Sequence, residues 1–499
     1  MRPSQNTTIF SETSGATATR RGFLQAPAWF VAPGGLLTGR RASGGEVVSP
    51  ATNKLSAYMS EARSQALPDE VLEKVKHHIL DTFAAMISGS QLPPGRAAER
   101  FARVQGGAEI ATVTASKVLC GAADAAFANG VLAHSDETDD SHAPSQSHPG
   151  CAVIPAALAA GEHFGIAGMD FLRSVALGYD IGSRVSMTLG GREFQTRTHR
   201  DSHSLANGFG AAAAAGCAAN LNARQMRWLL DYAAQQTGGI AAWQRDVDHM
   251  EKAFVFAGMT ARNGVTAALL VQSGWSGVDD IMSGSDNFLL ANTPDADPNG
   301  LIEKLGQRFE VVRTNIKKWS VGSPIQAPLD ALDILRKRHG FQAGQVQQVI
   351  VRVATREATV VNNREMPDIC LQHMIAVMLV DGTVSFSSAH DKVRMKDAAI
   401  LRERAKVQLI SDEELEGRLP RREAIVEIIF NDNTHVRERV EAVRGTAENP
   451  MTREEVVAKS RDLIAPVFGM ATCTNLIAAV FRLKNLKDIR ELRPLLQGR

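Results

Sequence analysis

The sequence predicts a mainly α-helical protein, built as a large all-α domain with an inserted, smaller α+β domain. Up to about residue 308, apolar residues recur at spacings of three and four, as on one face of a helix. Apolar and polar residues alternate at 349–353 and 424–440, as in strands. We therefore expect a helical domain over 50–308, an α+β domain over 309–447, and helices over 448–499 that return to the first domain.

The first domain is expected to contain helices and no convincing strand. A helix over 67–88 places its apolar residues on one stripe: Val71, Val75, Ile79, Phe83 and Met86. Pro68 suits its first turn, and Gly89 ends it. Further helices are expected near 96–105, 121–134, 150–164, 168–188, 205–219, 223–236 and 258–273. Several contain runs of Ala and Gly, which favour close packing in the interior.

In the α+β domain, Val349, Val351 and Val353 mark one strand, and residues 424–430 form a second. Asn431-Asp432-Asn433 predicts a turn into a hairpin partner over 434–440. Helices are expected near 323–339, 370–380 and 392–405. Thr452 and Glu455 then form a capping box that opens the C-terminal helical stretch.

The composition excludes several classes of function. The 499 residues include 55 Lys and Arg against 54 Asp and Glu, so a nucleic-acid binder or a polybasic membrane binder is not expected. Five scattered cysteines without a Cys-x-x-Cys pair exclude a zinc knuckle and disfavour a disulfide scaffold. The motifs of P-loop NTPases, serine hydrolases of the Gly-x-Ser-x-Gly type and zinc proteases of the His-Glu-x-x-His type are absent.

The N-terminal residues 1–45 resemble a bacterial twin-arginine export signal. Arg20 and Arg21 precede Phe23 and Leu24, and a weakly apolar stretch rich in Pro and Gly follows. This pattern predicts a periplasmic protein without stable membrane insertion. The alternative is a basic tail on a cytoplasmic protein.

Acids and histidines are concentrated in one segment, His134 to His142, which His148-Pro149-Gly150 follows after a short gap. Acids at this density repel one another unless cations or substrate protons compensate them. The segment indicates a metal site or a site of acid–base chemistry, and a solvated loop is the alternative.

Two further segments carry charge beside apolar residues. His199, Arg200, Asp201 and His203 precede an Ala-rich helix, where an anion site or ordinary capping by Asp201 or Ser204 is expected. Lys252 precedes an apolar run, and Lys317 and Lys318 precede Trp319. Such lysines either take part in the function or cover apolar surface with the aliphatic part of their side chains.

Read together, these segments resemble the MmgE/PrpD family, which includes 2-methylcitrate dehydratase, cis-aconitate decarboxylase and iminodisuccinate epimerase. The family pattern His-x-x-Asp-Phe-Asp-Asp-Thr-His matches residues 134–142, and its His-Pro matches His148-Pro149. The two family lysines fall at Lys252 and Lys317, and a Phe-Gly-Ala-rich helix falls at 209–216. The resemblance runs from about residue 55 to the C-terminus and implies a helical domain with a smaller lid domain.

The resemblance implies a homodimeric lyase that needs no metal or cofactor and acts on a small polycarboxylate. In this interpretation a proton is removed next to a carboxylate and water is lost. Lys252, Lys317 and a protonated His148 stabilise the developing charge, and Glu137, Asp201 and His203 are candidates for acid and base. The complete expected set is Glu137, His148, Asp201, His203, Lys252, Lys317 and His373 for catalysis, with Asp140, Ser141, Ser204 and Ser323 for substrate binding.

The chain departs from the family pattern around this site. Glu137 and Thr138 replace an Asp and an aromatic residue, and Asp201 stands where His is usual. His373 replaces Tyr, and Gln326 replaces His. An epimerase or isomerase, a decarboxylase of a related acid, and a non-catalytic exported carboxylate-binding protein therefore remain as alternatives.

Overall fold

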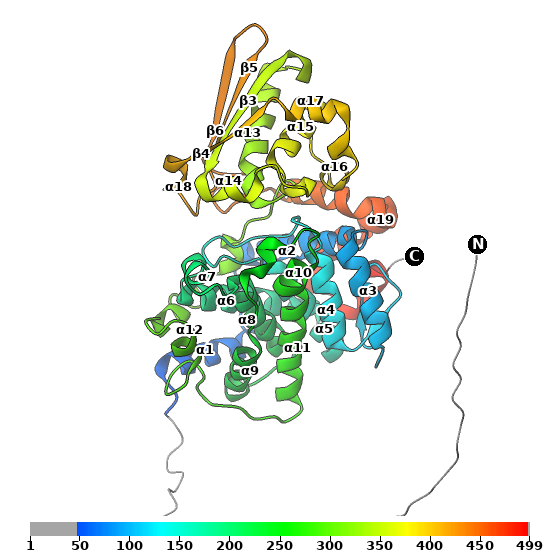
Figure 1. Cartoon of the computed structure of the whole chain (residues 1–499). Helices are drawn as coiled ribbons and strands as arrows, with labels where there is room; N and C mark the ends of the chain where they lie inside the picture. Colours follow the sequence, from blue (N-terminus) through cyan, green and yellow to red (C-terminus); the bar gives the residue numbers. More distant parts are fainter. Residues whose placement is uncertain (1–46, 498–499) are drawn as a thin grey trace, which may run out of the picture. The chain divides into compact units, whose positions relative to one another are not determined.

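The computed structural model describes residues 47–497 and confirms the mainly α-helical fold (Figure 1). The predicted export signal, residues 1–45, lies outside the described residues. Within the described part, buried apolar side chains form two clusters. One draws on residues 55–316 and 451–496, and the other on residues 319–443. We call the two parts of the chain the helical domain and the lid domain.

The helical domain is built around α8, whose seventeen residues are all buried. Because this helix consists mostly of Ala and Gly, α5, α6 and α11 approach it closely. The helices of this domain are α1 (Pro50–Glu61), α2 (Asp69–Gly89), α3 (Pro93–Gln105), α4 (Ala122–Ala133), α5 (Gly150–Phe164), α6 (Gly168–Leu189), α7 (Arg192–Thr198), α8 (Ser202–Ala218), α9 (Ala223–Gln236), α10 (Met250–Ala253), α11 (Met259–Gln272), α12 (Phe288–Asn292), α19 (Arg453–Phe481) and α20 (Arg493–Leu496).

The lid domain contains a four-stranded sheet in the order β4-β3-β5-β6. Strand β3 (Val346–Ala354) pairs in parallel with β4 (Val407–Asp412) and antiparallel with β5 (Ala424–Phe430), which forms a hairpin with β6 (His435–Val440). Helices α13 (Ser323–His339) and α15 (Leu371–Asp381) pack against this sheet. The shorter helices are α14 (Thr355–Val361), α16 (Phe386–His390), α17 (Ala398–Arg404) and α18 (Glu413–Glu416).

The structure differs from the sequence-based expectation at several places, and helices α1, α12, α14, α16 and α18 are among the elements that the expectation lacks. Two strands, β1 (Ala111–Thr112) and β2 (Leu119–Cys120), pair within the first domain, where none is expected. Each has two residues, too few for an alternation to be recognised. Strand β4 and helix α7 are also unexpected, because a short edge strand and a seven-residue helix carry weak periodicity.

Two helical stretches, Met250–Gln272 and Arg453–Phe481, are long and apolar enough to cross a membrane when judged by length and composition alone. Core helices of soluble proteins pass the same test. Most of the first stretch is buried in the protein. The second packs on α2, and its Lys459 forms a buried ion pair of 2.6 Å with Asp81.

The contact between α6 and α8 depends on Gly182. A Cβ atom at this position would lie 2.3 Å from the carbonyl oxygen of Ala206 and 3.0 Å from the Cα of Gly210. Both are backbone atoms, so neither can move aside without displacing a helix.

We predict that Gly182→Ala lowers the free energy of unfolding by roughly 1–3 kcal/mol, the usual cost of overpacking a core. Urea denaturation measures this change. Gly344→Ala is the control, because a Cβ there meets open space, and it should leave stability nearly unchanged. A Gly182→Ala protein as stable as the parent would contradict the close helix contact.

Candidate active site

The loop of residues 134–149 joins α4 to α5 and is largely buried, although it carries several acids and histidines. Asp136 holds its start by accepting hydrogen bonds from the backbone N–H (2.9 Å) and the hydroxyl (2.5 Å) of Thr138. Ser141 holds its middle through two backbone hydrogen bonds to Asn315, of 2.9 and 2.8 Å. The alternative of a solvated loop is therefore wrong.

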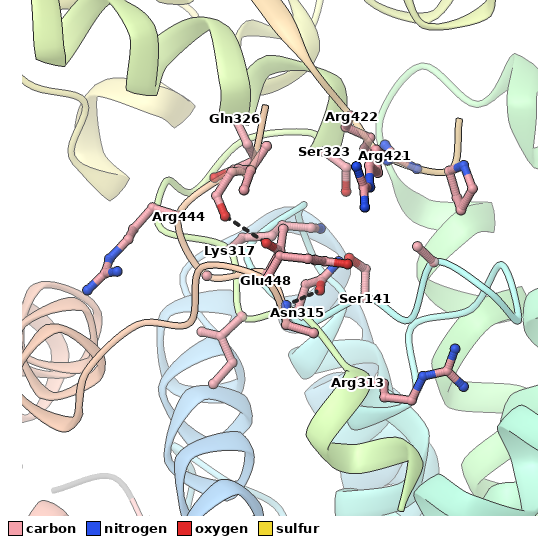
Figure 2. Close-up of a pocket in the computed structure, with 18 of the residues that line it drawn as sticks. Ser141, Arg313, Asn315, Lys317, Ser323, Gln326, Arg421, Arg422, Arg444 and Glu448 are labelled. Atoms are coloured by element: carbon pink, nitrogen blue, oxygen red, sulfur yellow. Dashed lines mark hydrogen bonds between the residues drawn. The ribbon is translucent and has the colours of Figure 1, made fainter. Parts of the chain in front are cut away.

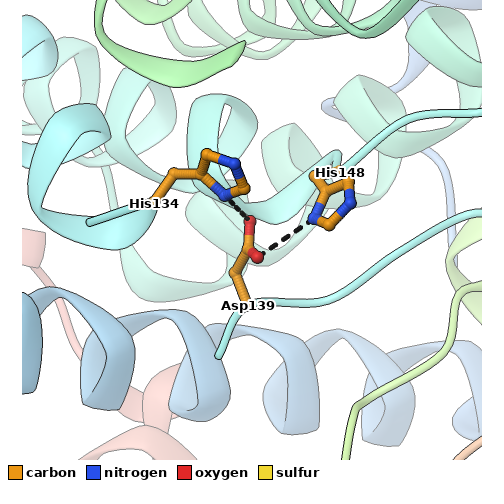
Figure 3. Close-up of side chains that lie close together, drawn as sticks. All are labelled: His134, Asp139 and His148. Carbon is orange, nitrogen blue, oxygen red and sulfur yellow. Dashed lines mark hydrogen bonds and ion pairs between the residues drawn. The ribbon is translucent and has the colours of Figure 1, made fainter. Parts of the chain in front are cut away.

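The carboxylate of Asp139 lies at the centre of this loop (Figure 3). Its Oδ2 is 2.9 Å from Nδ1 of His134, and its Oδ1 is 3.0 Å from Nδ1 of His148. The ammonium of Lys317 lies 3.6 Å from the same Oδ1. Because an ionised carboxylate can only accept, each imidazole donates its Nδ1 proton to it, and in a neutral ring this leaves Nε2 as an acceptor.

Burial lowers the pKa of His148 well below its usual value, and Lys317 lowers it further, whereas Asp139 opposes the shift. His148 is therefore a neutral base near pH 7 and not the protonated cation expected from the sequence. Burial raises the pKa of Asp139, but the neighbouring His134, His148 and Lys317 outweigh this effect and hold the pKa of that carboxyl well below its usual range.

The same three residues, His134, Asp139 and His148, also have the spacing of a metal site, since one ligand atom from each lies within 4.8 Å of the others. In the observed arrangement both Nδ1 atoms already face the carboxylate, and the ammonium of Lys317 supplies a positive charge beside it. The two histidine N–H groups and the ammonium of Lys317 thus already satisfy the carboxylate of Asp139.

Glu137 lies between two lysines. Its Oε1 forms an ion pair with Lys252, and its Oε2 lies 3.5 Å from Nζ of Lys317, which also donates a 2.7 Å hydrogen bond to the Glu137 carbonyl. Burial raises the pKa of Glu137, but the charges of both lysines outweigh this and hold it well below its usual value. Glu137 is therefore ionised, and its ion pairs hold the two lysines next to each other.

A second carboxylate–imidazole pair stands at the start of α8. Asp201 caps this helix by accepting the N–H of Ser204 at 2.7 Å, and its other oxygen is 3.0 Å from Nδ1 of His203. Trp243 donates to the same oxygen at 2.9 Å. The His203 ring stacks on Phe256 with a centroid distance of 3.9 Å, and burial lowers its pKa. His203 is thus also oriented with Nε2 as its free acceptor.

Several of these side chains line one cavity of about 470 Å³ between the helical and lid domains. Its volume lies in the range of pockets that take small organic ligands. Its ionisable lining residues include Glu137, His148, His203, His249 and Lys252. Trp243 and Phe256 add aromatic surface to the lining.

A second cavity of about 280 Å³ lies beside the first (Figure 2). Ser323 and Arg422 line both cavities. Lys317 lines the second cavity, while its ammonium reaches Glu137 at the edge of the first. The turn that carries Lys317 is held by Gln326, whose side-chain amide donates to the carbonyls of Trp319 and Val321 at 2.8 and 2.9 Å.

Comparisons with known proteins show the family to which this chain belongs. The MmgE/PrpD N-terminal domain matches residues 53–300, and the MmgE/PrpD C-terminal domain matches residues 319–483. The chain belongs to the MmgE/PrpD family. Its similar curated relatives include a cis-aconitate decarboxylase-like protein of Aspergillus oryzae, 24% identical over 90% of this chain and 97% of the relative. Cis-aconitate decarboxylases of Aspergillus terreus and Mus musculus are also 24% identical, over 90% of this chain and 96% and 93% of their own lengths.

Six of the expected MmgE/PrpD site residues come together in space. Glu137, His148, His203 and Lys252 line the large cavity, and Lys317 contacts Glu137 and approaches Asp139. Ser323 also lines this cavity, whereas Ser141 lines only the second of the two.

The other expected residues lie behind the cavity or away from it. Asp201 acts on His203 and caps α8, as the capping alternative predicts, and Ser204 donates to backbone carbonyls. Asp140 is an internal anchor that accepts from His78 at 2.8 Å and from the N–H of Gly150 at 2.9 Å. His373 is buried in α15 and does not line either cavity, so the structure does not bring it to the site.

Sequence reasoning misses His249, Trp243 and Phe256. His249 precedes Lys252 by three residues and has a left-handed backbone with a φ of 66°. Phe256 lies in a π-helical turn, Phe254–Gly258, of a kind often found at functional sites. Phe256 and the apolar run around it have the composition of a core helix, so nothing in the sequence marks it as a site residue.

His390 of α16 connects the lid domain to the loop of residues 134–149. Its Nε2 lies 2.9 Å from Oδ2 of Asp136 in the helical domain, and its Nδ1 donates to the carbonyl of Phe386 at 2.8 Å. Burial lowers the pKa of His390, but the hydrogen bond to Asp136 and the charges of Asp136 and Asp368 prevail and raise it to about 9.

This ion pair predicts a pH-dependent contribution to stability. Because the pKa of His390 is raised above its unfolded value of about 6.5, the contribution is complete below about pH 6.5 and is lost as the pH rises through about 9. We expect His390→Gln to cost on the order of 2–3 kcal/mol at about pH 6 and little at about pH 10, as measured by urea denaturation.

The matched control is His435→Gln. His435 lies 2.9 Å from Glu427 on the exposed face of the hairpin, where an ion pair contributes little. It should have a small effect across this pH range. A cost of His390→Gln that is the same at both pH values would contradict the ion pair with Asp136.

Proposed function

We propose that this MmgE/PrpD protein is a cofactor-independent lyase that acts on a small polycarboxylate by moving a proton at a carbon next to a carboxylate. The observation that carries the proposal is the Nε2 of His148, a free acceptor on a neutral imidazole that faces a cavity also lined by Lys252. A base and a cation in one cavity suit the formation of a carbanion beside a carboxylate.

In dehydration, the C–H proton passes to Nε2 of His148 and its electron pair forms the C=C bond. The C–O bond breaks, and the leaving oxygen takes a proton from an ammonium group such as Lys252, so water departs. The charge that develops on the neighbouring carboxylate is stabilised by Lys252 and Lys317, which stand on either side of Glu137. A neutral His148 supports this reaction directly, since dehydration begins with a base.

Decarboxylation is the second candidate, and the three relatives named above favour it. In that reaction the bond to one carboxylate carbon breaks, CO2 leaves, and its electron pair remains on the substrate. An acid then delivers a proton to carbon. His148 and His203 each have a carboxylate at Nδ1 that stabilises a protonated ring, so either can carry that proton.

The test is proton NMR of the purified protein in D2O with citrate and with cis-aconitate. A new vinyl signal from citrate establishes dehydration, and CO2 release from cis-aconitate establishes decarboxylation. We expect His148→Gln to lower turnover at least about 100-fold, the usual contribution of a general base. His339→Gln, at an exposed position on α13, should match the parent.

Turnover by His148→Gln at the parental rate would contradict the role of this base. Silence of the parent protein toward both acids and related polycarboxylates, with binding still seen by calorimetry, would instead support a carboxylate-binding protein without catalysis.

A further inference from the structure

The large cavity has a second chemical wall, formed by arginines, that the proposed reaction does not use. Arg192 of α7 enters from the helical domain, and Arg356, Arg364 and Arg422 enter from the lid domain. Arginine guanidinium groups recognise carboxylates through paired N–H donors in a fixed plane. Four of them on one cavity are therefore a candidate anion subsite.

The charges of this wall are only partly compensated. Arg356 pairs with Glu416 at 2.5 Å, and Arg422 lies 3.4 Å from the buried carboxylate of Glu357. Among the described residues, Arg192 and Arg364 form no ion pair with an acid. Arg192 and Arg364 thus line the cavity without a direct ion pair, although the carboxylates of Glu357 and Glu416 act on Arg192 from a greater distance.

Arg192 is held in place for binding. Its Nε donates a 3.1 Å hydrogen bond to Oε1 of Gln146, which belongs to the same loop as His148. Burial lowers the pKa of Arg192, and the nearby charges of Arg422 and Arg356 act in the same direction, so these arginines stand close enough to repel one another. An anion between them would relieve that repulsion.

The two walls fit different parts of one ligand. Lys252 and Lys317 are paired with Glu137 beside the histidines and serve a carboxylate at the reacting carbon. A tricarboxylate carries further carboxylates, and a cavity of about 470 Å³ has room for them. Arg192 is hydrogen-bonded to the loop of His148 and lines the same cavity as the lid arginines.

We infer that Arg192 and Arg364 bind a carboxylate that takes no part in bond breaking, and that they select tricarboxylates over dicarboxylates. This inference rests on the proposed function for its choice of ligand. Arg192 and Arg364 are specificity-determining residues, whereas the chemical step is carried out by His148 and Lys252.

The test is calorimetric binding of three saturated acids, so that no turnover is needed. Tricarballylate has three carboxylates, methylsuccinate lacks one terminal carboxylate, and glutarate lacks the central one. The parent protein should bind tricarballylate at least about tenfold more tightly than either dicarboxylate.

The double variant Arg192→Met/Arg364→Met should weaken tricarballylate binding about tenfold or more and leave at least one dicarboxylate unchanged. Arg192→Lys/Arg364→Lys keeps the charge without the planar fork, so it should recover part of the affinity and shows that the fold tolerates both positions. Arg402→Met, at an exposed position on α17, is the matched control and should bind all three acids as the parent does.

Unchanged tricarballylate binding in the double Met variant would overturn the inference, and so would an equal loss for all three acids, which would indicate a response to net charge alone. Failure of the parent to bind any of the acids would also overturn it. If the double Met variant loses only the binding of tricarballylate and the parent protein shows no turnover, only the proposed reaction is refuted. Turnover with unchanged selectivity would refute only the arginine subsite.

Discussion

Asp139 carries a negative charge with no exposed surface, and the site is organised around the groups that compensate it. A buried carboxylate without partners is very costly, so folding requires His134, His148 and Lys317 to meet it. These residues come from the end of α4, the start of α5 and the segment that leads into the lid domain. One carboxylate thereby fixes the orientation of the base and ties the reactive loop to the border between the domains.

The second acid of the loop, Glu137, explains how two lysines can lie side by side at the border of the two domains. It forms ion pairs with Lys252 and Lys317, and these contacts hold both ammonium groups close to the place where we propose that a carboxylate of the substrate lies. Across the cavity, the unpaired positive charge is carried by arginines. Separate cationic walls allow one end of a ligand to react while another end is only held.

Part of this arrangement is readable from the sequence. The helices around the site follow from apolar spacing, and the dense acids and histidines of residues 134–148 indicate chemistry because solvated loops seldom carry them at that density. Lys252 and Lys317 are recognisable only with the family pattern beside them. Arg192 and His390 are not, because each becomes a neighbour of the site only through packing between segments far apart in the chain. His373 shows the reverse: it fills a family position, yet the lid core encloses it.

The central claim is that Asp139 holds His148 as a neutral base with its proton on Nδ1. Nitrogen-15 NMR of the histidine rings at about pH 7 tests this directly, with His148→Gln used to assign the signal. We expect a neutral ring protonated at Nδ1, and in Asp139→Asn we expect that tautomer to be lost. A cationic His148, or a neutral ring with its proton on Nε2, in the parent protein would contradict the account.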